Sequence, residues 1–296
     1  MPTVQLSNES THFIGRFTAM ASPCEVLTET NDEALARRLL DAVADCAWRI
    51  ERKFSRYRTD SIVHRINQSG GEALFVDEET GNLLDFAATL TSLSDGRFDI
   101  TSGVLRKAWT FDGGDRLPEQ AQLDALLPFV GWQKVDWQRP RLRLQPGMQI
   151  DFGGIGKEYA VDTAATLADS IAPGTSCVVN FGGDVAVHHA RRDGQPWRIG
   201  IESVVHSGRA TRLVNLSRGA LATSGDSRRF VLKDGVRYSH ILDARTGWSV
   251  RDAPHSITVA ADTCTQAGTL TTLAMLQGAH AEQFLREAGA TYWIQH

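Results

Sequence analysis

The sequence predicts an α+β fold, with mixed, largely antiparallel sheets and packed helices. Segments with helical spacing of apolar residues alternate irregularly with strand-like segments, rather than as repeated strand–helix–strand units. The turn dipeptides Asp193–Gly194 and Asp234–Gly235 stand between strand-like segments, as they do in antiparallel hairpins. Because no internal repeat or linker divides the chain, a single domain over residues 1–296 is favoured.

In the first half of the chain, residues 1–12 are expected to form a flexible N-terminus. Alternating residues predict a strand over 13–28, interrupted at Ser22–Pro23, and apolar residues at helical spacing predict a helix over 32–54 with Asn31 or Asp32 as its N-cap. The remaining elements expected in this half are a short helix at 60–67, a helix at 78–94, an extended segment and short helix at 98–109, a short helix at 119–127, strands at 134–137 and 141–144, and a strand-like run at 148–152.

The second half is expected to be richer in strands. A helix over 159–168 follows a glycine-rich turn, and a helix of small and apolar residues is expected over 265–276. Between these helices, alternation predicts strands at 176–180, 185–189, 197–202, 211–217, 219–223, 230–231, 236–242 and 256–261.

Composition excludes several classes of function. The chain has 296 residues, of which 42% are hydrophobic and 22% charged, which is ordinary for a soluble enzyme. Its net charge of -4 argues against a general binder of nucleic acid or membrane surfaces. No apolar run is long enough to insert into a membrane, and the N-terminus lacks the basic and apolar regions of a secretory signal. The isolated cysteines are expected to be reduced thiols, so a cytoplasmic location is predicted.

The segment D-F-G-G-I-G-K-E-Y-A-V-D, residues 151–162, is the strongest local indication of chemistry. Glycines before a helix let backbone N–H groups approach an anion, and the helix N-terminus adds a partial positive charge. Lys157 would add a full charge, and Asp151 could hold a hydroxyl or a metal. The segment favours a phosphate-bearing ligand, although it matches neither G-x-G-x-x-G nor a Walker A loop, and a glycine turn used only for packing is an equal alternative.

Polar residues gather beside glycine-rich turns and predicted strand ends, where side chains converge on ligands. They are Asn67, Asp99, Asp151, Lys157, Asn180, Asp184, Thr223, Ser224, Asp226, His240, Asp243, Arg245 and Thr272. Each has a purely structural alternative. The run 181–184 is also consistent with a tight strand connection, the run 243–247 with a turn capped by its own Asp, and His240 with a satisfied histidine on a half-buried strand.

Taken together, these segments resemble one family in order along the chain, the FAD:protein FMN transferases of the ApbE family. The matching segments are M-A-S-P-C (20–24), F-S-R-Y-R-T-D-S (54–61), D-G-R-F-D-I-T (95–101), D-F-G-G-I-G-K-E-Y-A-V-D (151–162), N-F-G-G-D (180–184), A-T-S-G-D (222–226), Y-S-H-I-L-D-A-R-T-G (238–247) and T-L-T-T-L-A-M-L-Q-G (269–278).

The resemblance implies binding of FAD, cleavage of its pyrophosphate with Mg²⁺, and transfer of the FMN half to a Ser or Thr hydroxyl of a client protein, with release of AMP. His240, whose ordinary pKa is near neutrality, is the natural base for that hydroxyl. The backbone carbonyl of Gly154 is implied as a metal ligand. The positions implied or favoured as contacts to FAD are Met20, Tyr57, Arg97, Phe98, Asp99, Asp151, Lys157, Thr223, Ser224 and Leu242.

The chain departs from this family at the late metal-binding motif, which usually carries an Asp and a Thr. Here Gly268 stands in place of the Asp, whereas Thr272 is retained. Losing a carboxylate removes both charge and an oxygen ligand from a Mg²⁺ site. Water, Thr269, Thr271 or Asp262 are the substitutes considered. Two other functions therefore stay open beside the transferase: an FAD pyrophosphatase that forms FMN and AMP, and an FAD-binding protein with impaired catalysis.

Overall fold

An eight-stranded sheet organises the molecule. The computed structural model describes residues 3–206, 208–226 and 229–296. Every neighbouring pair of strands in the large sheet is antiparallel. In spatial order the strands are β1 (Gln5–Glu9), β2 (His12–Ala19), β3 (Ser22–Thr28), β7 (Cys177–Phe181), β8 (Asp184–Val187), β11 (Gly219–Gly225), β14 (Ser256–Ala261) and β15 (Thr291–Gln295). The predicted α+β class with largely antiparallel strands is confirmed.

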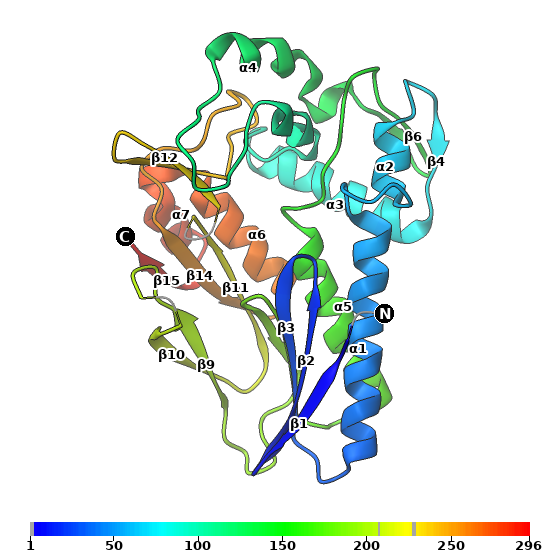
Figure 1. Cartoon of the computed structure of the whole chain (residues 1–296), viewed down its shortest axis with the longest axis vertical. Helices are drawn as coiled ribbons and strands as arrows, with labels where there is room; N and C mark the ends of the chain where they lie inside the picture. Colours follow the sequence, from blue (N-terminus) through cyan, green and yellow to red (C-terminus); the bar gives the residue numbers. More distant parts are fainter. Residues whose placement is uncertain (1–2, 207, 227–228) are drawn as a thin grey trace.

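Helices cover one face of this sheet, as Figure 1 shows. They are α1 (Glu33–Phe54), α5 (Gly156–Ile171), α6 (Cys264–Met275) and α7 (Ala281–Glu287). The predicted helix over 32–54 is confirmed, and Asp32 is its N-cap, accepting a hydrogen bond from Leu35 N at 3.1 Å. Buried residues of α1, α5 and α6 form the main core together with β2, β3, β7 and β11. No helix in the described ranges is long and apolar enough to cross a membrane.

A small hairpin covers part of the opposite face. Strands β9 (Trp197–Glu202) and β10 (Ala210–Leu216) form a separate two-stranded sheet. Trp197 and Ile201 pack with Val214, and these residues form a second core with apolar side chains of β7 and β8. The sheet thus has apolar residues on both faces, which explains why β8 is buried along its whole length.

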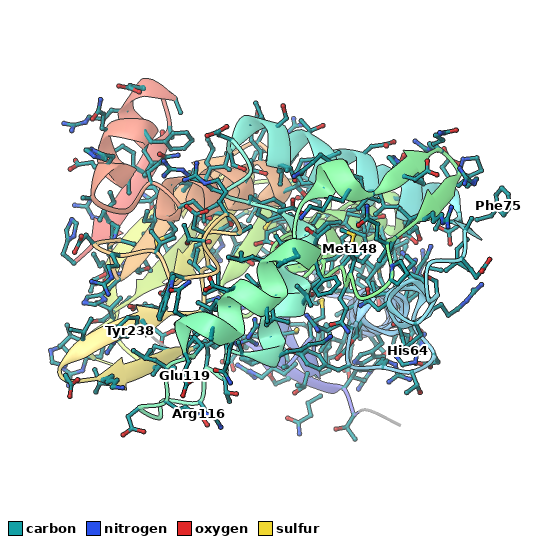
Figure 2. All side chains as sticks on the ribbon, turned by 90° about the horizontal axis from the view of Figure 1, so that it is seen from above. His64, Phe75, Arg116, Glu119, Met148 and Tyr238 are labelled. Carbon is teal, nitrogen blue, oxygen red and sulfur yellow. The ribbon has the colours of Figure 1, made fainter. Side chains whose placement is uncertain are left out.

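The remaining elements form the end of the molecule at the top of Figure 1. They are α2 (Ile62–Asn67), β4 (Leu74–Phe75), α3 (Glu78–Leu93), the 3-10 helices η1 (Ile100–Lys107), η2 (Leu127–Phe129), η3 (Trp132–Lys134) and η4 (Gly278–His280), α4 (Gln120–Leu126), β5 (Asp136–Gln138), β6 (Arg141–Arg143), β12 (Phe230–Lys233) and β13 (Val236–Ser239). Viewed from above, Tyr238 of β13 lies beside the loop that carries Arg116, while Phe75 projects at the far edge (Figure 2). In this loop, Gly113 N donates a hydrogen bond to Phe230 O at 2.9 Å.

Three local expectations are wrong. Residues 5–9, expected to belong to a flexible N-terminus over 1–12, form strand β1 paired with β2, whereas residues 1–2 lie outside the described part. The strand expected over 13–28 is a hairpin, because the chain turns at Met20 and Ala21. The strand-like run 148–152 is irregular. The Asn67 side chain occupies both backbone groups of Ile150, accepting from its N–H at 2.7 Å and donating to its carbonyl at 3.0 Å, so the main chain needs no neighbouring strand.

Candidate active site

Lys157 carries a fixed positive charge in the first turn of α5. Its Nζ atom lies 2.9 Å from Oδ2 of Asp184, a residue at the start of β8 that is 1% exposed. The other oxygen of Asp184 accepts a hydrogen bond from Thr223 N at 3.1 Å. Burial, the largest single effect, would lower the pKa of Lys157, but the charge of Asp184, the charge of Glu158 and the hydrogen bond to Asp184 together outweigh it and the pKa is raised. The helix N-terminus thus places the Lys157 ammonium beside Asp184 at the start of β8, and the phosphate-bearing ligand expected at this turn stays a prediction.

Glu158, the next residue along the helix, was not singled out from the sequence. Its Oε2 atom is buried and has no hydrogen-bond partner among the described residues. The side chain packs against Gly268 of α6, where an added Cβ would lie 2.5 Å from Glu158 Cγ. Burial, followed by the nearby Asp184 charge, raises the pKa of Glu158 to about 8. The available signal was its position inside the glycine-rich motif, directly after Lys157.

Hydroxyl groups from β11 and α6 meet beside Gly268. Ser224 Oγ lies 2.9 Å from Thr271 Oγ1, and the fully buried Thr271 also donates to the Gly268 carbonyl at 3.0 Å. Thr223 Oγ1 is 2.8 Å from Thr258 Oγ1. Thr272 is only partly buried, and its hydroxyl forms no hydrogen bond within the described part of the chain. The Thr272 hydroxyl is therefore free to bind a ligand, whereas that of Thr271 is already engaged.

Two of the substitutes considered for the missing carboxylate are poorly placed. Thr269 donates its hydroxyl to the Thr265 carbonyl, one turn earlier in the helix, at 2.8 Å. Asp262 is exposed, before α6 begins. Glu158 is the acidic side chain that packs against position 268.

Two tight turns lie close to Lys157. Met20 and Ala21 connect β2 to β3 with φ values of 51° and 54°, which costs non-glycine residues about 1–3 kcal/mol each. The run 181–184 is the tight strand connection that the sequence left as an alternative, with Gly182 and Gly183 at positive φ. The second turn contacts the start of β3, directly after the first turn, through a hydrogen bond of 2.9 Å from Gly182 N to Pro23 O. Strain at Met20 therefore occurs beside the candidate site.

The glycine turn before α5 is shaped by close contacts. A Cβ at Gly154 would lie 3.0 Å from Phe98 Cε2, so glycine allows the ring to approach the backbone. Asp151 accepts a hydrogen bond from Gly153 N at 2.9 Å and forms an ion pair with Arg56 at 3.2 Å. Arg56 was also not singled out from the sequence, although it directly precedes Tyr57. The Asp151 carboxylate is thus held in place by protein groups.

In the Arg97–Asp99 segment, Arg97 is partly exposed and Asp99 is buried. Arg97 donates to the Leu276 carbonyl at 2.8 Å and lines a surface cavity of about 270 Å³ together with Asp243 and Gln277. Asp99 is buried, and it accepts hydrogen bonds from Thr101 N, Thr101 Oγ1 and Trp132 N at 2.8, 2.7 and 2.6 Å. Its carboxylate therefore caps η1, and the predicted contact of Asp99 with FAD stays a prediction.

The remaining predicted contacts differ in exposure. The Tyr57 ring is 81% exposed, with the Arg56 guanidinium 6.0 Å from its centroid, so a flat ring could stack on it. Leu242 is partly buried and packs against the core around Trp109. Asp243 accepts a hydrogen bond from Arg245 N at 3.0 Å, so the run 243–247 is the capped turn that the sequence had left open.

His240 follows β13 in the upper part of the molecule. Its Nδ1 atom lies 3.2 Å from the Arg229 carbonyl, which can only accept, so Nδ1 carries the proton and Nε2 keeps a free lone pair. The ring contacts Phe111 edge-on, with centroids 6.3 Å apart. Burial lowers the pKa of His240 to about 4, and the charges of Arg106 and Arg229 contribute. The imidazole is therefore neutral at pH 7 in electropositive surroundings.

The structure brings together the groups of α5, β8, β11 and α6 around Lys157, Glu158 and Gly268. His240 forms no hydrogen bond to that group within the described residues. Across residues 3–206, 208–226 and 229–296, no cluster of three or more His, Cys, Asp and Glu side chains is arranged to hold a metal ion. A cation here would therefore depend on hydroxyl and carbonyl oxygens as well as carboxylate.

Comparison with known proteins identifies the family of this chain. A family model described as the ApbE family matches residues 20–293. A Vibrio cholerae protein named FAD:protein FMN transferase is 32% identical over 257 residues, covering 85% of this chain and 75% of that protein. A Salmonella typhimurium protein of the same name is 31% identical over 252 residues, covering 81% and 71%.

Solved structures give the same result. The crystal structure of the ApbE protein from Thermotoga maritima has a TM-score of 0.87 and 32% identity, covering 96% of this chain and 94% of that one. The apo form of the flavinyl transferase ApbE from Pseudomonas stutzeri has a TM-score of 0.82 and 26% identity, covering 99% and 91%.

Proposed function

This chain belongs to the ApbE family and is an FAD:protein FMN transferase, and we propose that it modifies a Ser or Thr hydroxyl of a client protein with His240 as base. The hydroxyl oxygen attacks the phosphorus on the FMN side of the FAD pyrophosphate. The bond from that phosphorus to the bridging oxygen breaks, AMP leaves, and the hydroxyl proton passes to His240.

The state of His240 carries this assignment. The Arg229 carbonyl fixes the proton on Nδ1, which leaves Nε2 as the acceptor. The lowered pKa, about 4, keeps the imidazole unprotonated at pH 7. Arg106 and Arg229 place positive charge near the same ring, which favours the approach of an anionic substrate. A neutral imidazole with a free Nε2 can accept the hydroxyl proton, and an anionic substrate bound beside it would raise its pKa toward the pH at which a general base is most effective.

A divalent cation, Mg²⁺ in our proposal, fits the group around Gly268. The unpartnered buried oxygen of Glu158 would be a hard anionic donor once a bound cation displaces its proton, and the free Thr272 hydroxyl is on the helix that Glu158 contacts. The cation would be held by Glu158, the Gly154 carbonyl and Thr272. The hydroxyl of Thr271 would keep Ser224 in position through their hydrogen bond. When bound, the cation would neutralise charge developing on the pyrophosphate. Lys157 would add positive charge from the start of α5.

Replacement of His240 by Ala tests the proposal. We expect the rate of FMN transfer from FAD to an acceptor protein to fall by roughly 10²-fold or more, because the acceptor hydroxyl loses its base. FAD affinity should change little. Transfer is followed by the mass of the acceptor, and binding by titration calorimetry. His206→Ala, at an exposed histidine in the β9–β10 connection, is the matched control.

Two results would contradict the proposal. Full transfer by His240→Ala would exclude its role as base. Release of FMN and AMP by the wild-type protein, with no mass added to any acceptor hydroxyl, would identify a pyrophosphatase instead.

A further inference from the structure

Glu158 occupies the space into which a side chain at position 268 would project. A Cβ placed on Gly268 would lie 2.5 Å from Glu158 Cγ and 3.0 Å from Glu158 Oε1. Contacts below about 3 Å do not occur for Cβ atoms without movement of the neighbour. The two helices α5 and α6 therefore allow a carboxylate from position 158, or a side chain from position 268, but not both in this arrangement.

One oxygen of the buried Glu158 carboxyl group has no partner in the described part of the chain and could bind a cation in place of a proton. Its Oε2 atom is buried and accepts no hydrogen bond within the described residues. The nearest positive group in the sequence, Lys157, is directed to Asp184 at 2.9 Å. A buried carboxyl oxygen without a partner is costly as a bare anion, so such a group is normally protonated, paired or coordinated to a cation.

Other oxygen donors lie one helical turn away. Thr271 and Thr272 follow Gly268 by three and four residues in α6, so they share its helix face. The Thr271 hydroxyl donates to the Gly268 carbonyl at 3.0 Å, which places this turn of α6 against the Glu158 contact. Carboxylate and hydroxyl oxygens on facing helices form the type of donor set that binds hard cations.

We infer that Glu158 provides, from α5, the carboxylate ligand of a divalent cation at the position that a carboxylate on residue 268 would otherwise serve from α6. Glycine at 268 is then a condition for the metal site, because it leaves room for Glu158. The inference rests on the proposed function only in assigning this cation to the pyrophosphate reaction. It makes residues 158 and 268 a coupled pair.

Glu158→Gln tests the ligand role, because it removes the charge but preserves the shape. Mn²⁺ is titrated into the protein, alone and with saturating FAD, and free Mn²⁺ is followed by electron paramagnetic resonance. We expect the affinity to fall by about tenfold or more. Glu33→Gln, an exposed Glu in the first turn of α1, is the matched control and should bind as the wild type does. Equal binding by Glu158→Gln and the wild type, or no binding by the wild type in either condition, would overturn the inference.

The exchanged pair tests the coupling. Glu158→Gly alone should bind Mn²⁺ weakly. The double variant Glu158→Gly, Gly268→Asp should bind Mn²⁺ at least tenfold more tightly than this single variant, because the carboxylate is supplied again, now from α6. Failure of the double variant, if it is folded by circular dichroism, would refute the coupling. These readouts are separate from FMN transfer. If the wild-type protein transfers FMN and Glu158→Gln binds Mn²⁺ as the wild type does, only the inference is refuted. Mn²⁺ binding through Glu158 without any transfer refutes the proposed function alone.

Discussion

At the scale of single residues, the meaning of Gly268 depends on a side chain far away in the sequence. Considered alone, glycine at this position would remove a carboxylate from a Mg²⁺ site, which is the interpretation that the sequence by itself suggests. The structure places the Glu158 carboxylate against the same position, on the adjacent helix. The absence of a side chain at position 268 is therefore matched by the Glu158 side chain, which fills the space beside it.

Gly268→Asp alone should consequently destabilise the protein. The new side chain would compete with Glu158 for one space, and overpacking of this kind costs about 1–3 kcal/mol. The free energy of unfolding is measured by urea denaturation followed by circular dichroism. Adding Glu158→Gly should restore most of the loss. An unfolding midpoint equal to that of the wild type would mean that Glu158 moves away at no cost.

At the scale of elements, one carboxylate ties three helices together near the site. Glu79 of α3 accepts hydrogen bonds from Arg49 of α1 at 2.8 and 2.9 Å, from Lys53 of α1 at 2.6 Å and from Tyr159 of α5 at 2.8 Å. Burial would raise the pKa of Glu79, but these donors outweigh it and lower the pKa to about 2. Because Tyr159 directly follows Glu158, this network fixes the start of α5.

Glu79→Gln should reduce the free energy of unfolding at pH 7 by roughly 1–3 kcal/mol, since charge-assisted hydrogen bonds are lost. The folded-state pKa of Glu79 lies below the unfolded value, so its contribution is complete above about pH 4.5 and is lost as the pH falls toward 2. The difference between variant and wild type should therefore shrink over that window. Urea titrations at several pH values measure it, with Glu78→Gln, at the exposed neighbour, as control. A difference independent of pH would contradict the assignment.

Elements with strong periodicity could be predicted from the sequence, whereas those decided by side chains far along the chain could not. The α1 and α3 helices have long apolar stripes and acidic N-caps, so local signals suffice. The run 148–152 has a strand pattern, but the Asn67 side chain takes the role of a strand partner. No element was predicted for the end of the chain, where the structure has helix α7 and strand β15. Strand β15 pairs with β14 and so adds the last strand to the large sheet.

At the scale of the whole molecule, the candidate site combines groups from separate cores. Lys157 and Glu158 belong to α5, whose buried residues pack in the main core. The region around His240 instead packs with the core of Trp109 and Val231, and His240 contacts Phe111. The sequence could predict Lys157 and His240 from motifs, but it could predict neither Glu158 nor how these groups are oriented. That arrangement depends on contacts between segments far apart in the chain, such as Gly113 with Phe230.

The surroundings of His240 predict an unusual pH dependence of FMN transfer. Burial, then Arg106 and Arg229, lower the pKa of His240 to about 4, so the neutral base persists well below the ordinary value of 6.5. Activity should therefore fall only as the pH drops toward 4, and kcat/KM for FAD, which reports the free enzyme, should show an acidic limb below 6.5. Arg106→Gln, which removes a charge held 5.4 Å from the Phe111 ring centroid, should raise the His240 pKa and move that limb upward. Circular dichroism at each pH separates this effect from acid unfolding. A wild-type limb at 6.5 or above, unchanged in Arg106→Gln, would show that these cations do not set the protonation of His240.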